Sequence, residues 1–187
     1  MTDEANDPTP TDRIDVQRRI AAPPSAIFAV LADPEGHVDI DSSGMLMSAT
    51  GDRVGAVGDS FVVHMDREAL NDFPLGEYDV TVKIVRFEPD RQIAWKIEGQ
   101  IKPQIGHMYG YLLEPDPGAD QERGDDERDD EPGAEPGATI VTSYYDWSEI
   151  HPDWRAAGIF PVLSEGALRA TLGILARTVA RRATGDD

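Results

Sequence analysis

The sequence predicts an α+β fold in which a curved antiparallel sheet of about seven strands surrounds one long C-terminal helix. Three observations lead to this prediction. Several segments alternate apolar and polar residues with the period of a half-buried strand. An apolar stripe with helical spacing runs through the C-terminal residues. Signals for two short helices follow the first strand directly.

The first predicted strand covers residues 13–20, where apolar Val16 and Ile20 recur at alternating positions. Pro23 and Pro24 end it, because proline lacks a backbone N–H and fixes φ. The next residues favour two short helices, from Ser25 as the predicted cap to about His37. Asp33-Pro34 separates them, since a residue before proline avoids the helical region.

The remaining strands are predicted from alternation between turn residues, at 45–50, 59–65, 77–88, 92–98, 107–114 and 139–148. The clearest alternation lies in 77–88 and 92–98, which favours antiparallel strands with one face in water. The last helix is predicted from Pro161 to Arg182, and we expect Phe160-Pro161 to begin it. Its apolar stripe contains Leu168, Leu172, Leu175 and Val179.

Composition predicts one folded domain over 13–183, between an N-terminus (1–12) that we expect to be disordered and a short tail (184–187). The segment 116–137 is rich in proline, glycine and acidic residues. We expect it to be a disordered loop between two antiparallel strands.

The chain has 187 residues, a formal net charge of −19 and no cysteine. The absence of cysteine excludes disulfides, thiol catalysis and cysteine-ligated zinc. The acidic charge argues against nucleic-acid binding, because phosphates attract basic surfaces. No apolar run approaches the ~20 residues that span a bilayer, so we expect no stable membrane insertion. The acidic N-terminus is not typical of a signal or transit peptide, and we expect a cytoplasmic protein.

The order of elements from Val16 to Gly44 resembles the opening of the START/Bet v1-like (SRPBCC) helix-grip superfamily, and within it the bacterial polyketide cyclase/dehydrase-like proteins. The strand Tyr109-x-Tyr111-x-Leu113-Glu114-Pro115 is similar to a strand of that family. So is the last strand, Thr139-x-Val141-Thr142 followed by Tyr145-Asp146-Trp147. The resemblance covers about residues 13–183 and implies a helix-grip fold with an elongated apolar cavity between the sheet and the last helix.

The resemblance implies that the protein binds a small hydrophobic or amphipathic molecule, such as a lipid, a polyketide or an isoprenoid-like compound, without a cofactor. Two alternatives stay open. The protein could be an aromatase/cyclase or dehydratase that acts on a polyketide-like substrate, or a chaperone-like or toxin–antitoxin-like interaction protein. The sequence is compatible with a monomer and with a homodimer.

Candidate ligand-binding residues are aromatic side chains of the predicted strands and apolar residues near the start of the last helix. They are Trp95, His107, Tyr109, Tyr111, Tyr145, Trp147, Phe160, Leu163 and Ala167. Alternation in the strand 107–113 leaves two possible inner sets, because Gly106, Met108, Gly110 and Leu112 fit as well as His107, Tyr109 and Tyr111.

The candidates for acid–base catalysis are His107, Asp39 and Asp41. A hydrogen-bonded structural role is the favoured alternative for His107. The motif Asp39-x-Asp41-x-Ser43-Gly44 imitates a calcium loop, but Thr50 stands where a glutamate ligand is needed, so a capped turn is favoured. The four histidines do not pair at metal-ligand spacing, and we expect no metal site. The segment 151–155 is interpreted as a lid or a simple connection.

Overall fold

The computed structural model describes residues 12–72, 74–116, 118 and 137–185. In these residues the strands are β1 (Arg13–Ile20), β2 (Leu46–Thr50), β3 (Ser60–Asp66), β4 (Glu77–Glu88), β5 (Gln92–Glu98), β6 (Met108–Pro115) and β7 (Thr139–Asp146). The helices are α1 (Pro24–Leu31), α2 (Pro34–Asp39), η1 (Glu68–Leu70), α4 (Pro152–Ala156) and α5 (Glu165–Thr184). Most of the acidic segment and of the N-terminus lies outside the described residues, so the prediction of disorder there stays a prediction.

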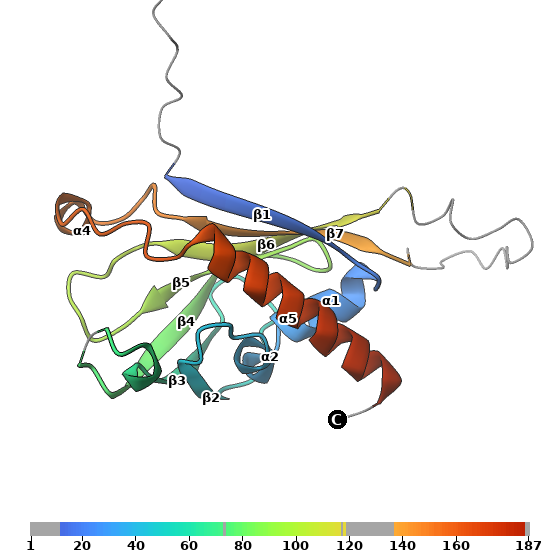
Figure 1. Ribbon diagram of the computed structural model, residues 1–187, viewed down its shortest axis with the longest axis horizontal. Helices are drawn as coiled ribbons and strands as arrows, with labels where there is room; N and C mark the ends of the chain where they lie inside the picture. The colour runs from blue at the N-terminus through green and yellow to red at the C-terminus, as the bar shows by residue number, and fades with distance from the viewer. Residues whose placement is uncertain (1–11, 73, 117, 119–136, 186–187) are drawn as a thin grey trace, which may run out of the picture.

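The strands form one antiparallel sheet in the order β1-β7-β6-β5-β4-β3-β2 (Figure 1). β6 and β7 pair along their whole length, from Met108 opposite Asp146 to Pro115 opposite Thr139. The two strands that flank the acidic segment are therefore antiparallel neighbours, as predicted. A seven-stranded antiparallel sheet with a long C-terminal helix confirms the predicted fold class.

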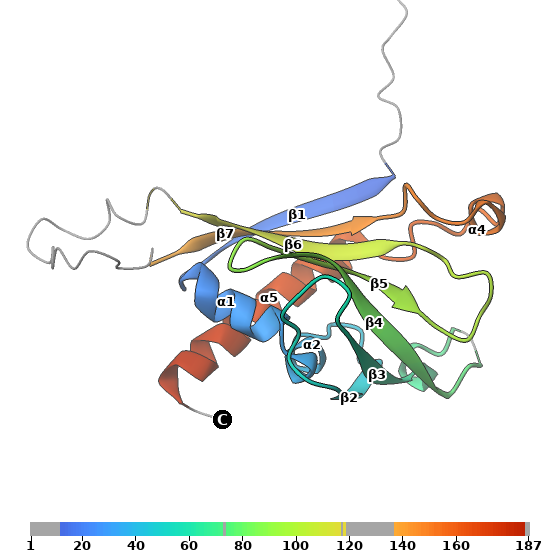
Figure 2. The same cartoon turned by 180° about the vertical axis from the view of Figure 1, so that it is seen from behind.

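The helices α1, α2 and α5 lie on one side of the curved sheet, which is clear from both directions (Figures 1 and 2). α5 contacts β1 and β7 and turns its predicted apolar stripe inward, so that Leu168, Leu172, Leu175 and Val179 are buried. Phe28 of α1 packs edge-on against Phe87 of β4. The main core therefore lies between the concave face of the sheet and these helices.

Two predicted helix starts were wrong. α5 begins at Glu165, because the Ser164 hydroxyl accepts a hydrogen bond from the N–H of Ala167 at 3.1 Å and caps the helix there. Phe160 and Pro161 belong to the segment that precedes it. Ser25 lies inside α1, whose N-cap is Pro23 without a side-chain capping bond, since proline at the first helical position is favourable on its own.

Strand ends differ from prediction by small amounts, and two short elements, η1 and α4, were not predicted. β7 ends at Asp146, because Ser148 donates two hydrogen bonds to the Asp146 carboxylate and closes a turn. The short helix α4 forms in the segment interpreted as a lid or connection. His151 is its N-cap and accepts from the N–H of Asp153.

Tyr144 decides which face of β6 points inward. Its ring lies over Gly110 on the outer, convex face, together with Met108 and Ala94. His107, Tyr109 and the rest of the alternate set therefore face the helices, and the alternative inner set that begins at Gly106 is excluded.

Among the described residues, no helix is both long and apolar enough to cross a bilayer.

Candidate functional site

Five rings meet on the concave side of β6 and β7, at the end of the sheet nearest α4. This aromatic cluster consists of His107, Tyr109, Tyr145, Trp147 and Phe160. The centroids of Tyr109 and Tyr145 are 5.0 Å apart, and those of Tyr145 and Trp147 are 5.4 Å apart. His107 packs edge-on against Tyr109 at 5.0 Å and Phe160 at 6.0 Å. Tyr109 and Tyr145 lie on β6 and β7, His107 and Trp147 directly flank these strands, and Phe160 comes from the segment before α5.

The central polar contact of the aromatic cluster joins His107 and Tyr145. The Nδ1 atom of His107 lies 3.0 Å from the Tyr145 hydroxyl, and both residues are buried. Burial lowers the pKa of His107 to about 4, because the imidazolium ion loses its hydration. His107 is therefore neutral near pH 7. One of its ring nitrogens bears a lone pair that can accept a proton, and the other nitrogen can donate one hydrogen bond.

The tyrosines of this region are neutral phenols. Burial raises the pKa of Tyr109 and of Tyr145 well above the ordinary value, and a hydrogen bond from the backbone of Val162 partly opposes the rise at Tyr145. Burial likewise raises the pKa of Tyr111 to about 12, against the effect of a hydrogen bond with Ser143. These hydroxyls can donate hydrogen bonds to a ligand, and they are poor nucleophiles because they stay protonated.

Trp95 extends the aromatic cluster toward the middle of the core. Its ring lies 6.4 Å from Tyr109 and 5.9 Å from Tyr111, and its other side meets His37 at 4.6 Å. His37 places Nε2 2.9 Å from the carbonyl oxygen of Leu31, and burial lowers its pKa to about 4. Sequence reasoning missed His37 as part of this region, because this residue stands in the short polar helix α2.

The structure brings most of the predicted ligand-binding residues together. Trp95, Tyr111 and Leu163 join the same core as the aromatic cluster. Ala167 is half-buried on α5, and its carbonyl accepts a hydrogen bond from Ser42. Ala167 therefore borders the α2–β2 connection, while the other predicted residues belong to the core or to the aromatic cluster.

The structure does not bring Asp39 and Asp41 to His107. The Asp41 carboxylate accepts hydrogen bonds from the N–H of Ser43 at 2.9 Å and from the N–H of Leu46 at 3.1 Å, and thereby forms the capped turn that the sequence favoured. Asp39 pairs with Arg182 near the end of α5 at 2.8 Å. Both carboxylates hold the chain in place, so His107 is the predicted catalytic candidate that lies in the aromatic cluster.

The segment 147–164 borders the aromatic cluster and is held at several points. Trp154 donates its indole N–H to the carbonyl of Pro103 at 2.8 Å, and the N–H of His151 donates to the carbonyl of Ile105. Arg155 pairs with Asp12. α4 and the β5–β6 loop therefore lie at the same end of the sheet (Figure 1).

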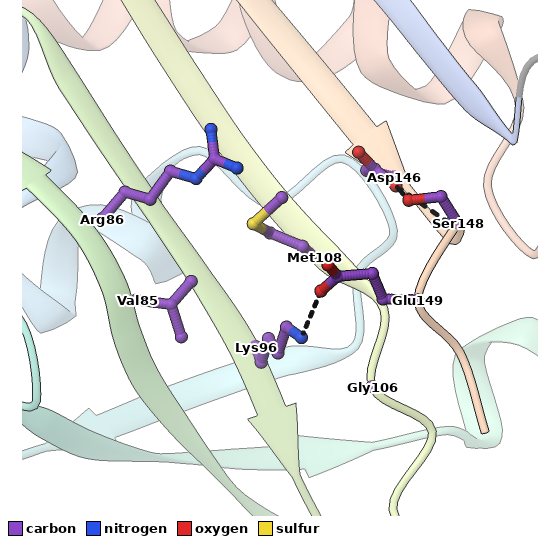
Figure 3. Close-up of a pocket in the computed structure, with 8 residues that line it drawn as sticks. All are labelled: Val85, Arg86, Lys96, Gly106, Met108, Asp146, Ser148 and Glu149. Atoms are coloured by element: carbon purple, nitrogen blue, oxygen red, sulfur yellow. Dashed lines mark hydrogen bonds and ion pairs between the residues drawn. The ribbon is translucent and has the colours of Figure 1, made fainter.

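Two hollows on the surface of the described residues lie outside the space between the sheet and α5. One, of about 310 Å³, is on the convex face, where Met108 lies between Arg86 and Asp146 and Lys96 pairs with Glu149 (Figure 3). The other, of about 440 Å³, borders η1 and the following loop. Neither hollow is the cavity that we expected between the sheet and α5, where buried core residues and the aromatic cluster lie. Within the described ranges, no group of three or more His, Asp or Glu residues is placed to hold a metal ion.

No protein-family model matches this chain, and no curated protein sequence is similar to it at a significant level. Solved structures do match. The Zhui aromatase/cyclase from Streptomyces sp. R1128 is similar with a TM-score of 0.56 and 17% identity, over 91% of this chain and 94% of that chain. Truncated norcoclaurine synthase from Thalictrum flavum is similar with a TM-score of 0.55 and 14% identity, over 89% and 92%. A protein from Deinococcus radiodurans gives 0.52 and 16%, over 92% and 98%.

Structural matches at identities this low establish a common fold, and they do not transfer an activity. In this chain the fold consists of the curved antiparallel sheet, the two short helices after the first strand and the long final helix. The chain thus has the helix-grip fold, in common with these solved structures.

Proposed function

We propose that this protein binds a small hydrophobic or amphipathic molecule between the concave face of the sheet and α5, beside the aromatic cluster. The observation that carries the proposal is the composition of that cluster. Apolar rings surround a few polar atoms, chiefly the hydroxyls of Tyr109 and Tyr145 and the imidazole of His107. Ligand sites are typically apolar with a few polar groups that fix the orientation of the ligand.

The partial exposure of the cluster supports this site. Tyr109, Trp147 and Phe160 are half-buried, although each packs against the core. Tyrosine and tryptophan are suited to such positions, because one end of the side chain is apolar and the other forms hydrogen bonds. A ligand that covers these rings gains the free energy of burying their remaining apolar surface.

Access to the site requires the segment 147–164 to move away from the sheet. Its apolar residues Ile159 and Val162 are exposed, at 52% and 48% of their surface. We infer that a bound molecule takes the place of water against these side chains and separates Phe160 from His107. Binding therefore changes the environment of the neighbouring Trp147.

The proposed ligand class is a lipid, a polyketide or an isoprenoid-like compound. Neutral His107, Tyr109 and Tyr145 favour a molecule whose polar part is an uncharged carbonyl or hydroxyl group, because no ionised side chain belongs to the aromatic cluster. Among similar structures, norcoclaurine synthase was solved with dopamine and hydroxybenzaldehyde, which are small aromatic compounds. That similarity supports a small organic ligand and leaves its identity open.

Native mass spectrometry of gently purified protein tests the proposal by detecting a co-purified small molecule. A second assay titrates the neutral apolar dye N-phenyl-1-naphthylamine and follows its fluorescence. Phe160→Ser should weaken dye binding roughly tenfold, since about 1.4 kcal/mol of apolar contact is a factor of ten. Val57→Ser, which changes an exposed apolar residue in the β2–β3 loop, should bind like the wild type. Equal binding by both variants, with no co-purified molecule, contradicts the proposal.

The second candidate function is that of an aromatase/cyclase or dehydratase, and the contact between His107 and Tyr145 favours it. A neutral imidazole can remove a proton next to a carbonyl group, while a phenol donates a hydrogen bond to the carbonyl oxygen. A poly-β-ketone substrate should then give cyclised or dehydrated product, and His107→Gln should abolish product formation while dye binding persists. If product forms only at the background rate while the dye still binds, the enzymatic candidate is contradicted and the binding function stands.

A further inference from the structure

Three polar side chains lie in series on the convex face of the sheet, which is the face opposite α5. The Nε2 atom of His64 is 2.8 Å from the Thr50 hydroxyl, and its Nδ1 atom is 2.7 Å from the carboxylate of Asp79. We propose that Thr50, His64 and Asp79 form a second reactive site, in which Thr50 accepts an acyl group from small activated esters. This site is independent of the aromatic cluster.

Strand register places these three residues together. β2, β3 and β4 are neighbours, and His64 stands directly opposite Asp79 in the β3–β4 pairing. Phe61 and Val63 of β3 point into the core, so the intervening side chains point outward. Thr50 is the last residue of β2 and reaches the other side of the His64 ring. Residues of three consecutive strands thus meet in the order nucleophile, base and carboxylate.

The carboxylate determines which nitrogen of His64 carries the proton. An ionised Asp79 can only accept hydrogen bonds, so Nδ1 must be the donor in that contact. In the neutral imidazole Nε2 then bears the lone pair, and the Thr50 hydroxyl donates to it. This arrangement prepares His64 to remove the proton of Thr50, and Asp79 acts as the positioning residue that holds the required tautomer.

Exposure determines the class of substrate. The side chains of His64 and Asp79 are 40% and 62% exposed, and Thr50 is exposed as well. Side chains this open to solvent provide no enclosed wall to select or desolvate a large substrate. The site therefore suits small acyl donors with good leaving groups, which depend least on stabilisation of the developing oxyanion.

The reaction balances without a cofactor. The Thr50 oxygen forms a bond to the acyl carbon while its proton passes to Nε2 of His64. The bond to the leaving oxygen breaks, and His64 returns the proton to the departing alcohol. A water molecule then attacks the acyl-threonine ester, with His64 again as the base, and releases the carboxylic acid and free Thr50.

The test uses the full chain and p-nitrophenyl acetate, with peptide mass spectrometry at short times to locate the acetyl group. Ser60 is an internal control, because it is an exposed hydroxyl on the same strand as His64. Acetylation of Thr50 should proceed at least about ten times faster than that of Ser60, within the usual contribution of a positioned base. Acetylation of Thr50 at the rate of Ser60 overturns the proposal.

Three variants separate the roles. Thr50→Val should remove the acetylated peptide, and His64→Gln should reduce the rate at Thr50 to that at Ser60. Asp79→Asn should lower the rate and also change the imidazole ¹⁵N spectrum, because the amide can donate to Nδ1 and release the tautomer. A wild-type spectrum with Nδ1 unprotonated, or a Thr50 rate that Asp79→Asn leaves unchanged, contradicts the proposed role of Asp79. All three residues are surface residues, and circular dichroism checks that each variant is folded.

Discussion

The ring of Tyr144 occupies the space that a side chain at Gly110 would need. A β-carbon placed on Gly110 would lie 2.4 Å from Cζ and 2.5 Å from the hydroxyl oxygen of Tyr144. Tyr144 is 1% exposed, and the guanidinium of Arg13 lies 4.1 Å above its ring. This contact on the convex face fixes the orientation of β6 and thereby sends Tyr109 and Tyr111 toward α5.

Gly110→Ala should therefore destabilise the protein by about 1–3 kcal/mol, the usual range for overpacking a tight site. Urea denaturation measures the free energy of unfolding. Gly99→Ala is the matched control, since a β-carbon there meets only Val80 at 3.8 Å. If the two variants are equally stable, Tyr144 moves aside without cost and does not determine the face of β6.

Tyr145→Phe should destabilise the protein by about 1–3 kcal/mol, because it leaves Nδ1 of the buried His107 without its partner. The ring contacts with Tyr109 and Trp147 are kept, so the loss reports the hydroxyl alone. Urea denaturation measures the free energy of unfolding of this variant and of His107→Phe, which removes the imidazole partner instead. A Tyr145→Phe variant as stable as the wild type shows that His107 finds another partner.

Stability should fall as the pH drops from 7.5 to 5. Burial lowers the pKa of both His37 and His107 to about 4 in the folded state, while an unfolded histidine titrates near 6.5. Between these values the unfolded chain holds more protons, so acid favours unfolding. At about 1.36 kcal/mol per pH unit, the expected loss by pH 5 is on the order of 2 kcal/mol for each histidine.

Urea denaturation at pH 7.5 and pH 5 checks this expectation. His37→Gln and His107→Gln should each show a smaller loss between the two pH values than the wild type, because each removes one titrating group. An unchanged difference in both variants would mean that other groups cause the acid sensitivity.

Ser164→Ala should lower stability by about 1 kcal/mol, because the variant loses the hydroxyl that caps α5. Ser164→Asp restores an acceptor at the same position and should recover most of the loss. Thermal denaturation followed by circular dichroism compares the three proteins. An alanine variant with the wild-type melting temperature would place the effective start of the helix elsewhere.

The sequence by itself determined the order of the seven strands and of the helices α1, α2 and α5. Alternation in β4 and β5 predicted both strands with their observed bounds, since a period of two distinguishes a half-buried strand from a helix. The stripe from Leu168 to Val179 likewise identified the buried face of α5. Local signals misplaced the start of α5, because Ser164 and proline at 161 both fit a helix N-terminus and only the capping bond decides between them.

Tertiary structure decided which residues meet. The sequence left two inner sets open for β6, and the packing of Tyr144 on Gly110 selected the one with His107 and Tyr109. The tertiary structure also placed Asp39 with Arg182, away from His107. It brought Thr50, His64 and Asp79 together from three strands. Periodicity states which way a side chain points relative to its own strand, whereas a contact depends on the register between strands, which the fold as a whole sets.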